Sequence, residues 1–276
     1  MDKEKINVVN LHITDYCNFN CKFCFVKKEK FKATLEDLKI CVNKIYEYFS
    51  KNNIQNGRIN LAGGEPLIYN NLVELIDYIY SKNIEVSIIT NGYFLNKDFL
   101  EKVKGKVCMI GISIDSLNND VNIKLGRCQN GEKYCNEESY LSKCKLIKDS
   151  NIKLKINVCV NKYNYKENFT NFFKKAKADK IKFLQIKYEK NVNEECRELL
   201  ISKEQFEEFS RNNYAENIVF ESDESMIDSY LIVDSKCNVS TSNNHKSNMC
   251  LLNHSFEECL YNLNFDKDKF NKRYNI

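Results

Sequence analysis

Cys17, Cys21 and Cys24 place three thiols within eight residues near the start of the chain. Thiolates are the usual protein ligands of iron–sulfur clusters, and such close spacing lets one loop cover one face of a cuboidal cluster. Three thiolates for four irons leave one iron without a protein ligand. The spacing therefore predicts a [4Fe–4S] cluster with one iron open to a small molecule.

A structural zinc loop is the alternative for these cysteines. Zinc usually takes four ligands in paired Cys-x2-Cys or Cys/His units, and no second pair with that spacing follows. Cys237, Cys250 and Cys259 are too widely spaced to form one. The chain has 13 cysteines and no recognisable export signal, so most of the other ten are expected to be buried thiols.

An open iron of this kind could chelate the amino and carboxylate groups of S-adenosylmethionine (SAM). An electron from the reduced cluster would then break a carbon–sulfur bond of SAM and give a 5′-deoxyadenosyl radical. A second unusual segment is Gly63-Gly64-Glu65-Pro66, because the chain has only eight glycines and one proline. Their position after an expected strand, Arg58–Ala62, predicts a special backbone geometry. By itself the segment is also typical of an ordinary turn.

The hydrophobic periodicity predicts strands that alternate with helices of about ten or more residues. The expected strands are Asn7–Ile13, Arg58–Ala62, Ile84–Thr90, Val107–Ile114, Ile152–Val160, Ile181–Tyr188 and Ser229–Val233. The expected helices run from Leu35 to about Asn52 and over Leu72–Ser81, Ser139–Asp149, Phe169–Lys177 and Ser202–Arg211, while Ser240–Asn248 is polar and predicts a loop. This order favours an α/β fold, a partial (β/α)6 TIM-like barrel, with functional residues at the carboxyl ends of the strands.

Composition limits the kind of protein. The chain has 276 residues, 43% of them apolar and 29% charged, and a net charge of +4. We expect one domain over 1–276, with a core barrel at about 7–190 and a C-terminal extension at about 191–276. No apolar stretch is long enough to span a membrane, and the charge is too balanced to favour a nucleic acid polymer as partner. A cytoplasmic location is therefore expected.

Several segments together resemble the viperin-like radical SAM enzymes. The aromatic residues Phe19, Phe23 and Phe25 among the cysteines resemble the radical SAM signature, and Gly63-Gly64-Glu65-Pro66 resembles that superfamily's motif for the SAM amino group. Further viperin-like segments are Asn10-Leu11-His12-Ile13-Thr14, Ile59 to Pro66, Ser113-Ile114-Asp115-Ser116, Val121 to Arg127, Lys155-Ile156-Asn157 and Asp228 to Asp234. These matches extend from about residue 7 to residue 234.

The resemblance implies a specific reaction. Viperin-like enzymes bind SAM and a nucleoside triphosphate, remove the ribose 4′ hydrogen and lose the 3′ hydroxyl as water. The product is a 3′-deoxy-3′,4′-didehydro nucleotide, an antiviral terminator of RNA chains, so the enzyme is of the lyase type. CTP is the favoured substrate, with UTP or GTP as alternatives, and a flavodoxin or ferredoxin type of protein is the expected electron donor.

The resemblance also implies roles for particular residues. The cluster ligands are Cys17, Cys21 and Cys24; the SAM site comprises Gly63, Gly64, Glu65, Pro66, Thr90, Asn91, Ser113 and Arg127, with Arg127 at the SAM carboxylate. The substrate residues are Asn10, Arg58, Lys155, Asn157, Lys180 and Lys182, and Tyr230 is the catalytic residue that would deliver hydrogen after dehydration. Arg127 could instead be a solvated loop residue, Tyr230 a core residue with one hydrogen bond, and Asn10 and Asn157 could satisfy backbone groups.

The lysines give this interpretation some independent support. A triphosphate needs several cations that converge on one site. Lys153 and Lys155 lie on one face of an expected strand, as do Lys180 and Lys182, because side chains two residues apart share a face. Strand lysines that face solvent are the alternative.

Three features depart from the viperin-like pattern. Ala62 stands where the family often has serine before Gly-Gly-Glu-Pro. The basic segment after the last strand is reduced to His245 and Lys246, and a C-terminal tryptophan is missing because the chain has none. Two other hypotheses therefore stay open: a radical SAM enzyme that acts on a peptide or a deazapurine, and a non-enzymatic zinc module.

Overall fold

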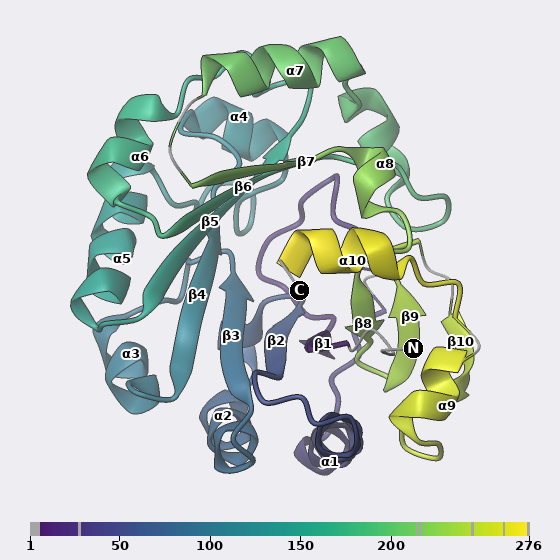
Figure 1. Ribbon diagram of the computed structural model, residues 1–276. Helices are drawn as coiled ribbons and strands as arrows, with labels where there is room; N and C mark the ends of the chain where they lie inside the picture. The colour runs from purple at the N-terminus through teal and green to yellow at the C-terminus, as the bar shows by residue number, and fades with distance from the viewer. Residues whose placement is uncertain are drawn as a thin grey trace.

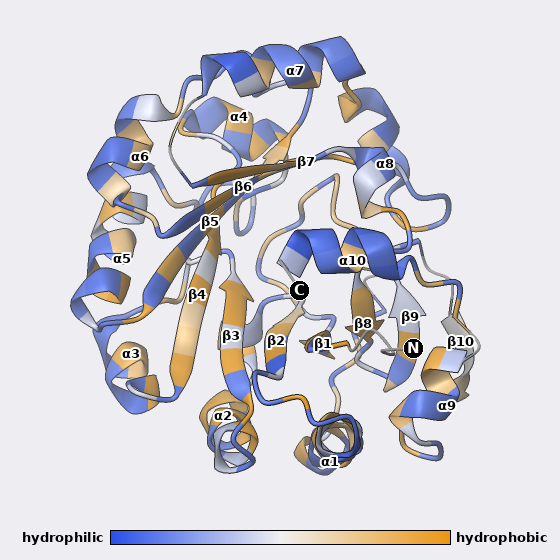
Figure 2. Cartoon of the chain, viewed as in Figure 1, coloured by the Kyte–Doolittle hydropathy of each residue, from blue (hydrophilic) through white to orange (hydrophobic). Residues whose placement is uncertain are grey.

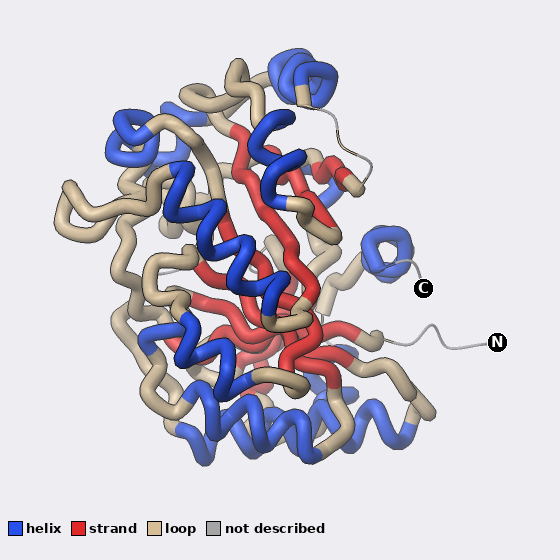
Figure 3. Tube along the Cα trace, turned by 90° about the vertical axis from the view of Figure 1, so that its left-hand side faces the viewer, coloured by secondary structure: helices blue, strands red, loops and turns tan. Residues whose placement is uncertain are grey.

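The protein forms one continuous ten-stranded sheet, in the order β10-β9-β8-β1-β2-β3-β4-β5-β6-β7. We describe a computed structural model that covers residues 6–26, 29–213, 215, 217–243, 246–261 and 263–274. Strands β1 to β7 pair in parallel with their neighbours, and β8 pairs in parallel with the other edge of β1. The sheet curves into an open barrel with helices outside it (Figures 1 and 3).

The elements follow the expected alternation. The parallel strands are β1 (Val8–Thr14), β2 (Arg58–Gly63), β3 (Glu85–Thr90), β4 (Val107–Ser113), β5 (Lys153–Val160), β6 (Lys180–Gln185), β7 (Ile218–Glu221) and β8 (Leu231–Val233). The helices are α1 (Leu35–Lys51), α2 (Leu72–Ser81), α3 (Lys97–Val103), α4 (Asn119–Lys124), α5 (Glu137–Asp149), α6 (Thr170–Ala176), α7 (Lys203–Asn212), α8 (Asp223–Met226), α9 (Phe256–Tyr261) and α10 (Lys267–Tyr274), with short 3-10 turns at Pro66–Ile68 and Glu194–Leu199. The predicted α/β barrel with six strand–helix units is confirmed through α7.

The two faces of the strands differ in chemistry. In β1, Val9, Leu11 and Ile13 are fully buried in the hydrophobic core, whereas Asn10 and His12 alternate with them on the other face. Because the helices cover the outer face, the alternate polar set lines the inside of the barrel. The helices carry most of their hydrophilic residues on their outward surfaces (Figure 2). The barrel interior is thus lined with polar groups, unlike an ordinary packed barrel core.

The C-terminal part differs from the prediction. The prediction of a loop over Ser240–Asn248 is wrong, because β9 (Asn238–Thr241) and β10 (Lys246–Cys250) pair there as antiparallel strands. Strand β9 also pairs with the buried strand β8. Its backbone hydrogen bonds to β8 therefore outweigh the polar composition of the β9 side chains. His245 lies outside the described residues. No described helix is long and apolar enough to cross a membrane.

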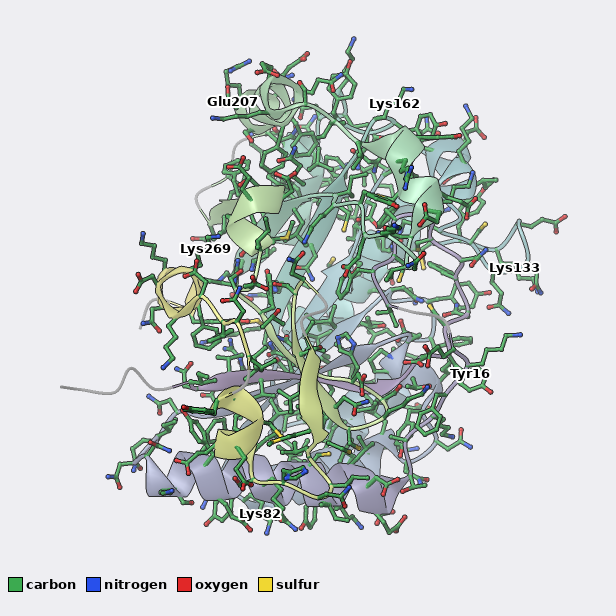
Figure 4. All side chains as sticks on the ribbon, turned by 90° about the vertical axis from the view of Figure 1, so that its right-hand side faces the viewer. Tyr16, Lys82, Lys133, Lys162, Glu207 and Lys269 are labelled. Carbon is green, nitrogen blue, oxygen red and sulfur yellow. The ribbon has the colours of Figure 1, made fainter. Side chains whose placement is uncertain are left out.

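Helix α10 and the cysteine loop lie at opposite ends of the barrel. Figure 4 places Lys269, on α10, on one side of the molecule and Tyr16, next to the cysteine loop, on the other. The loop follows the carboxyl end of β1, whereas α10 lies near the amino ends of the strands. Two chemically distinct regions can therefore occupy the two ends of one interior.

Candidate active site

The three cysteines lie on one loop at the carboxyl end of β1, as predicted. Cys17, Cys21 and Cys24 are partly buried, and the backbone N–H of Cys24 donates to the carbonyl of Cys21 at 3.2 Å. Among the described residues, no three His, Cys, Asp or Glu side chains converge on a single metal position. A cuboidal cluster takes each thiolate on a different iron, so this arrangement fits a cluster better than one zinc ion.

Nitrogen donors surround the sulfurs. The Phe19 backbone N–H donates to Cys17 Sγ at 3.4 Å, and the Asn91 side chain approaches the same sulfur at 3.9 Å. The Arg127 guanidinium lies 3.9 Å from Cys21 Sγ. Burial raises the pKa of Cys21 to about 12, while Arg127 acts in the opposite direction. Bonding to iron and these donors would together favour the thiolate form that a cluster requires.

Two glycines allow the cysteine loop to lie directly against its neighbours. A Cβ atom at Gly64 would lie 2.0 Å from the backbone oxygen of Tyr16, and one at Gly126 would lie 2.2 Å from that of Asn20. The Gly64 N–H donates to the carbonyl of Thr14 at 2.7 Å, and the Asn20 N–H donates to that of Gly126 at 2.9 Å. Backbone contact on both sides therefore fixes the loop, and only glycine permits the approach.

Glu65 holds the Gly-Gly-Glu-Pro segment against the next strand. Its carboxylate is fully buried and accepts hydrogen bonds from Thr90 Oγ1 and the Asn91 backbone N–H, each at 2.7 Å, and from the Leu67 N–H at 3.0 Å. Burial raises the pKa of this carboxyl, and the three donors lower it. The side chain thus joins two predicted SAM segments, and Pro66 begins the short 3-10 turn that follows.

Arg127 is buried between the cysteine loop and β4. Its guanidinium forms an ion pair with Asp115 at 2.6 Å and donates to the carbonyl of Ser113 at 2.7 Å. It also donates to the Tyr140 hydroxyl at 3.3 Å and lies over the Phe19 ring, 5.5 Å from its centre. The structure therefore excludes the alternative of a solvated loop arginine. It brings Arg127 and Ser113 together near Cys21, where the SAM carboxylate was predicted.

A ladder of amide side chains lines the middle of the barrel interior. Asn60 donates to Asn10 Oδ1 at 2.9 Å, accepts from Arg58 Nε at 3.2 Å and also accepts from the Ser87 hydroxyl. Asn10 in turn donates to the carbonyl of Leu231 at 2.9 Å. These contacts span β8, β1, β2 and β3, so the ladder joins four strands from inside.

Asn157 faces the same interior from β5, beside Ser113 in the register of β4 and β5. It is 7% exposed, and its Oδ1 atom has no hydrogen-bond partner within the part of the chain that the structure describes. A buried, unpaired amide oxygen is costly unless a ligand satisfies it. Asn157 is therefore suited to contact a bound molecule.

Four predicted phosphate-binding residues converge from three strands. Lys155 pairs in register with Lys180, and Asn157 with Lys182, across β5 and β6. Burial and the neighbouring lysines lower the pKa of Lys155 well below its usual value, and burial with Arg58 lowers that of Lys180. Neither Lys155 nor Lys180 has an ion-pair partner among the described residues. Lys155 and Lys180 are both half-buried, so neither matches the alternative of a strand lysine that is fully exposed to solvent.

Lys182 is different, because it belongs to a buried ion cluster that sequence reasoning missed. Glu221, at the end of β7, forms ion pairs with Lys182 and with Arg273 of α10, and it accepts a hydrogen bond from the Tyr230 hydroxyl. Lys182 Nζ donates to the Tyr230 hydroxyl at 3.0 Å. Burial lowers the pKa of Lys182 to about 8, against the opposing effect of Glu221.

The structure thus groups the predicted residues into two sets. The cluster and SAM residues gather at the carboxyl ends of β1 to β4, and the substrate residues line the interior below them. Tyr230 lies with the second set, in the extended segment just before β8 rather than within a strand. The site residues for which the sequence predicted no role are Asp115, Tyr140, Glu221, Arg273 and Tyr274, whose ring centre lies 5.8 Å from the Arg58 guanidinium. Arg273 and Tyr274 lie far from any motif, so nothing local in the sequence could indicate them.

Comparison with known proteins agrees with this arrangement. The model of the radical SAM superfamily matches residues 11–176. An S-adenosylmethionine-dependent nucleotide dehydratase of Flammeovirga pacifica is 32% identical over 237 residues, which are 82% of this chain and 79% of that protein. A protein of the same name from Lacinutrix mariniflava is 34% identical over 247 residues, 83% of this chain, and this chain spans about half (49%) of its length.

A solved structure, that of SuiB from Streptococcus suis bound to S-adenosylmethionine, superposes with a TM-score of 0.69 at 15% identity, over 98% of this chain and 68% of that one. At this identity the likeness establishes the fold alone. The fold and the family model together define a radical SAM protein, whose class uses a [4Fe–4S] cluster and SAM.

Within that class, the chain belongs to the S-adenosylmethionine-dependent nucleotide dehydratases, the viperin-like family that its motifs resemble. The predicted family and cofactors are therefore confirmed.

Proposed function

We propose that this protein is a nucleotide dehydratase that converts a nucleoside triphosphate to its 3′-deoxy-3′,4′-didehydro analogue, an antiviral terminator of RNA chains. The observation that carries the proposal is the convergence of Arg58, Lys155, Lys180 and Lys182 inside a barrel whose rim holds the cluster loop. A deazapurine, or a peptide without several acidic residues, offers no polyanion to match these cations. CTP is the favoured substrate, with UTP or GTP as alternatives.

Cys17, Cys21 and Cys24 would hold the cluster. When bound, the family's cluster and SAM would supply a 5′-deoxyadenosyl radical able to take a hydrogen atom from the substrate. Arg127, fixed by Asp115, is placed to neutralise the SAM carboxylate beside Cys21. Glu65 keeps Thr90 and Asn91 in place at the same rim, so that SAM would meet a preformed surface.

The substrate would lie along the barrel interior. Its phosphates would contact the lysines on β5 and β6 and Arg58 on β2, which points the ribose toward the cluster end. The Oδ1 atom of Asn157 would accept a hydrogen bond from a sugar hydroxyl or from a water molecule bound to a phosphate. Asn10 would act mainly through the ladder that orients Arg58.

Tyr230 would deliver a hydrogen atom once the 3′ hydroxyl has left, and one electron from the donor protein and one proton would then restore its phenol. Its hydroxyl donates to Glu221 and accepts from Lys182. Burial, followed by the nearby Glu221 charge, raises the pKa of Tyr230 well above its usual value, so the phenol is protonated near neutral pH. The same contacts support the proposal that the C-terminal extension forms one functional unit with the barrel.

The electron would come from a flavodoxin- or ferredoxin-type donor in the cytoplasm. Phe25, directly after the third cysteine, is 58% exposed and Tyr16 is 45% exposed. These side chains give a protein donor apolar surface beside the cluster loop.

The test is anaerobic incubation of the reconstituted protein with SAM, dithionite and each triphosphate in turn. At least one triphosphate, CTP foremost, should accelerate 5′-deoxyadenosine formation and be consumed. Nucleosides without phosphates form the matched control and should not stimulate the reaction. If SAM is cleaved slowly and no triphosphate accelerates it, the substrate assignment is wrong, and peptide or deazapurine substrates become the next panel.

A further inference from the structure

Five cationic side chains from four parts of the fold share one region of the barrel interior. They are Arg58 of β2, Lys155 of β5, Lys180 and Lys182 of β6, and Arg273 of α10. Each is close enough to influence the ionisation of at least one other: Lys155 responds to Arg58, Lys180 and Lys182, and Lys182 responds to Arg273. We call this set the cation pocket.

Arg273 is built into the pocket from the far end of the chain. Its side chain is 4% exposed, its Nε donates to Glu221 at 3.0 Å, and its guanidinium lies 3.9 Å from the centre of the Tyr230 ring. The same group donates to the carbonyls of Ser225 at 3.0 Å and of Ser229 at 2.5 Å. These contacts fix α10 across the gap between β7 and β8.

Glu221 is a carboxylate that faces the cation pocket, and both of its oxygens already have hydrogen-bond or ion-pair partners. Oε1 pairs with Lys182 and Arg273, and Oε2 accepts from Tyr230. No three carboxylate, histidine or cysteine side chains within the described ranges form a group that could hold a metal. When every group is ionised, five cations and one carboxylate leave four positive charges.

We infer that the cation pocket binds the triphosphate as its metal-free anion, with Arg273 as a fifth cation whose charge, like that of Lys182, Glu221 partly offsets in the ligand-free protein. This inference rests on the proposed function and specifies the form in which the substrate binds. A nucleoside triphosphate free of metal carries about four negative charges near neutral pH, which the pocket can balance without a further cation.

A magnesium complex fits the same pocket poorly. Proteins that bind Mg²⁺ with a nucleotide supply carboxylate or hydroxyl oxygens to it, beside one or two cations for the phosphates. Here a divalent ion would lie among five cations, and Glu221 would have to leave Lys182 or Arg273 to reach it. The ion would also cancel about two of the four phosphate charges that attract the side chains.

The first experiment measures binding of inorganic tripolyphosphate to the whole chain by calorimetry. We expect binding in buffer with EDTA and a dissociation constant at least tenfold higher when Mg²⁺ is in excess over the tripolyphosphate. Binding that requires Mg²⁺, or that Mg²⁺ strengthens, would overturn the inference, as would no binding in either buffer.

Two substitutions test the role of the Glu221–Arg273 pair. Glu221→Gln keeps the shape of the side chain but frees Lys182 and Arg273, so tripolyphosphate should bind several-fold more tightly; a purely structural role predicts weaker binding. Arg273→Gln should weaken binding about tenfold, whereas Arg211→Gln, at an exposed position on α7, should not. Looser binding by Glu221→Gln would contradict the proposed role even if Arg273→Gln failed to fold.

Failure of the proposed function gives a different result. If tripolyphosphate binds in EDTA but no nucleoside triphosphate accelerates 5′-deoxyadenosine formation, the inference about the cation pocket holds and the proposed reaction is wrong. If triphosphates accelerate that reaction only with Mg²⁺, the reaction stands and the metal-free form of the substrate is wrong.

Discussion

Replacing Lys155 by methionine should change stability and substrate use in opposite directions. Lys155 is half-buried and has no ion-pair partner among the described residues; burial and the neighbouring lysines lower its pKa well below the usual value, so the fold disfavours its charge. Methionine has a similar length and no charge, so it should stabilise the ligand-free protein by about 1–2 kcal/mol. In a domain of this size that corresponds to a rise in Tm of roughly 2–6 °C.

The same change should weaken the triphosphate contact. A hydrogen bond to a charged group contributes about 2 kcal/mol, so the KM for the triphosphate should rise roughly thirty-fold. The assays are thermal unfolding of the ligand-free protein and anaerobic 5′-deoxyadenosine formation against triphosphate concentration. Iron content should stay unchanged, because Lys155 lies away from the cysteine loop.

Lys153→Met is the matched control for Lys155→Met. Lys153 lies two residues earlier, on the same face of β5, and is exposed at the start of the strand. It should change neither Tm nor KM appreciably. A Lys155→Met protein that is less stable than the wild type and has an unchanged KM would refute the reasoning, because Lys155 would then contribute to structure alone.

Three further predictions follow from the site. The pKa of Lys182 is about 8 in the folded protein and 10.5 in the unfolded chain, so between these pH values the unfolded chain binds more protons. The free energy of unfolding of the ligand-free protein, measured in urea, should therefore rise with pH over this range. Binding of tripolyphosphate, measured by calorimetry, should weaken over the same range. Parallel trends would contradict this. Cys21→Ala should remove most of the roughly four irons per chain expected after reconstitution, whereas Cys108→Ala should retain them; equal iron contents would exclude Cys21 as a ligand. Gly64→Ala places a Cβ 2.0 Å from a backbone oxygen of the cysteine loop, so iron retention should fall severalfold, and wild-type retention would show that the loop can shift.

The sequence predicted the parallel half of the fold well because its signals are local. Thr34 caps α1 by accepting a hydrogen bond from the Asp37 N–H at 3.1 Å, and the apolar stripe of that helix is buried, as its spacing predicted. The strand lysines also lie where alternation predicted, on one face of β5 and β6. Such signals depend on neighbours within a few residues of one another.

The rest depends on contacts between distant segments. Glu221, Arg273 and Tyr230 meet only because α10 returns to the gap between β7 and β8, and no local pattern encodes that return. The β9–β10 pair was missed for a similar reason, since its residues are polar and pair with an edge that forms elsewhere in the chain. The family motif indicated Arg127, but only the structure shows that an ion pair with Asp115 holds it in place.

The gap between β7 and β8 has a consequence for how this enzyme could diversify. Side chains span it, through Glu221, Tyr230 and Arg273, where a closed barrel would use ladder hydrogen bonds. The bore of a fully bonded barrel is set by strand number and tilt. Here its width along one seam depends on three side chains rather than on strand pairing, so substitutions there would change the shape of the cation pocket while the strand pairing stays intact.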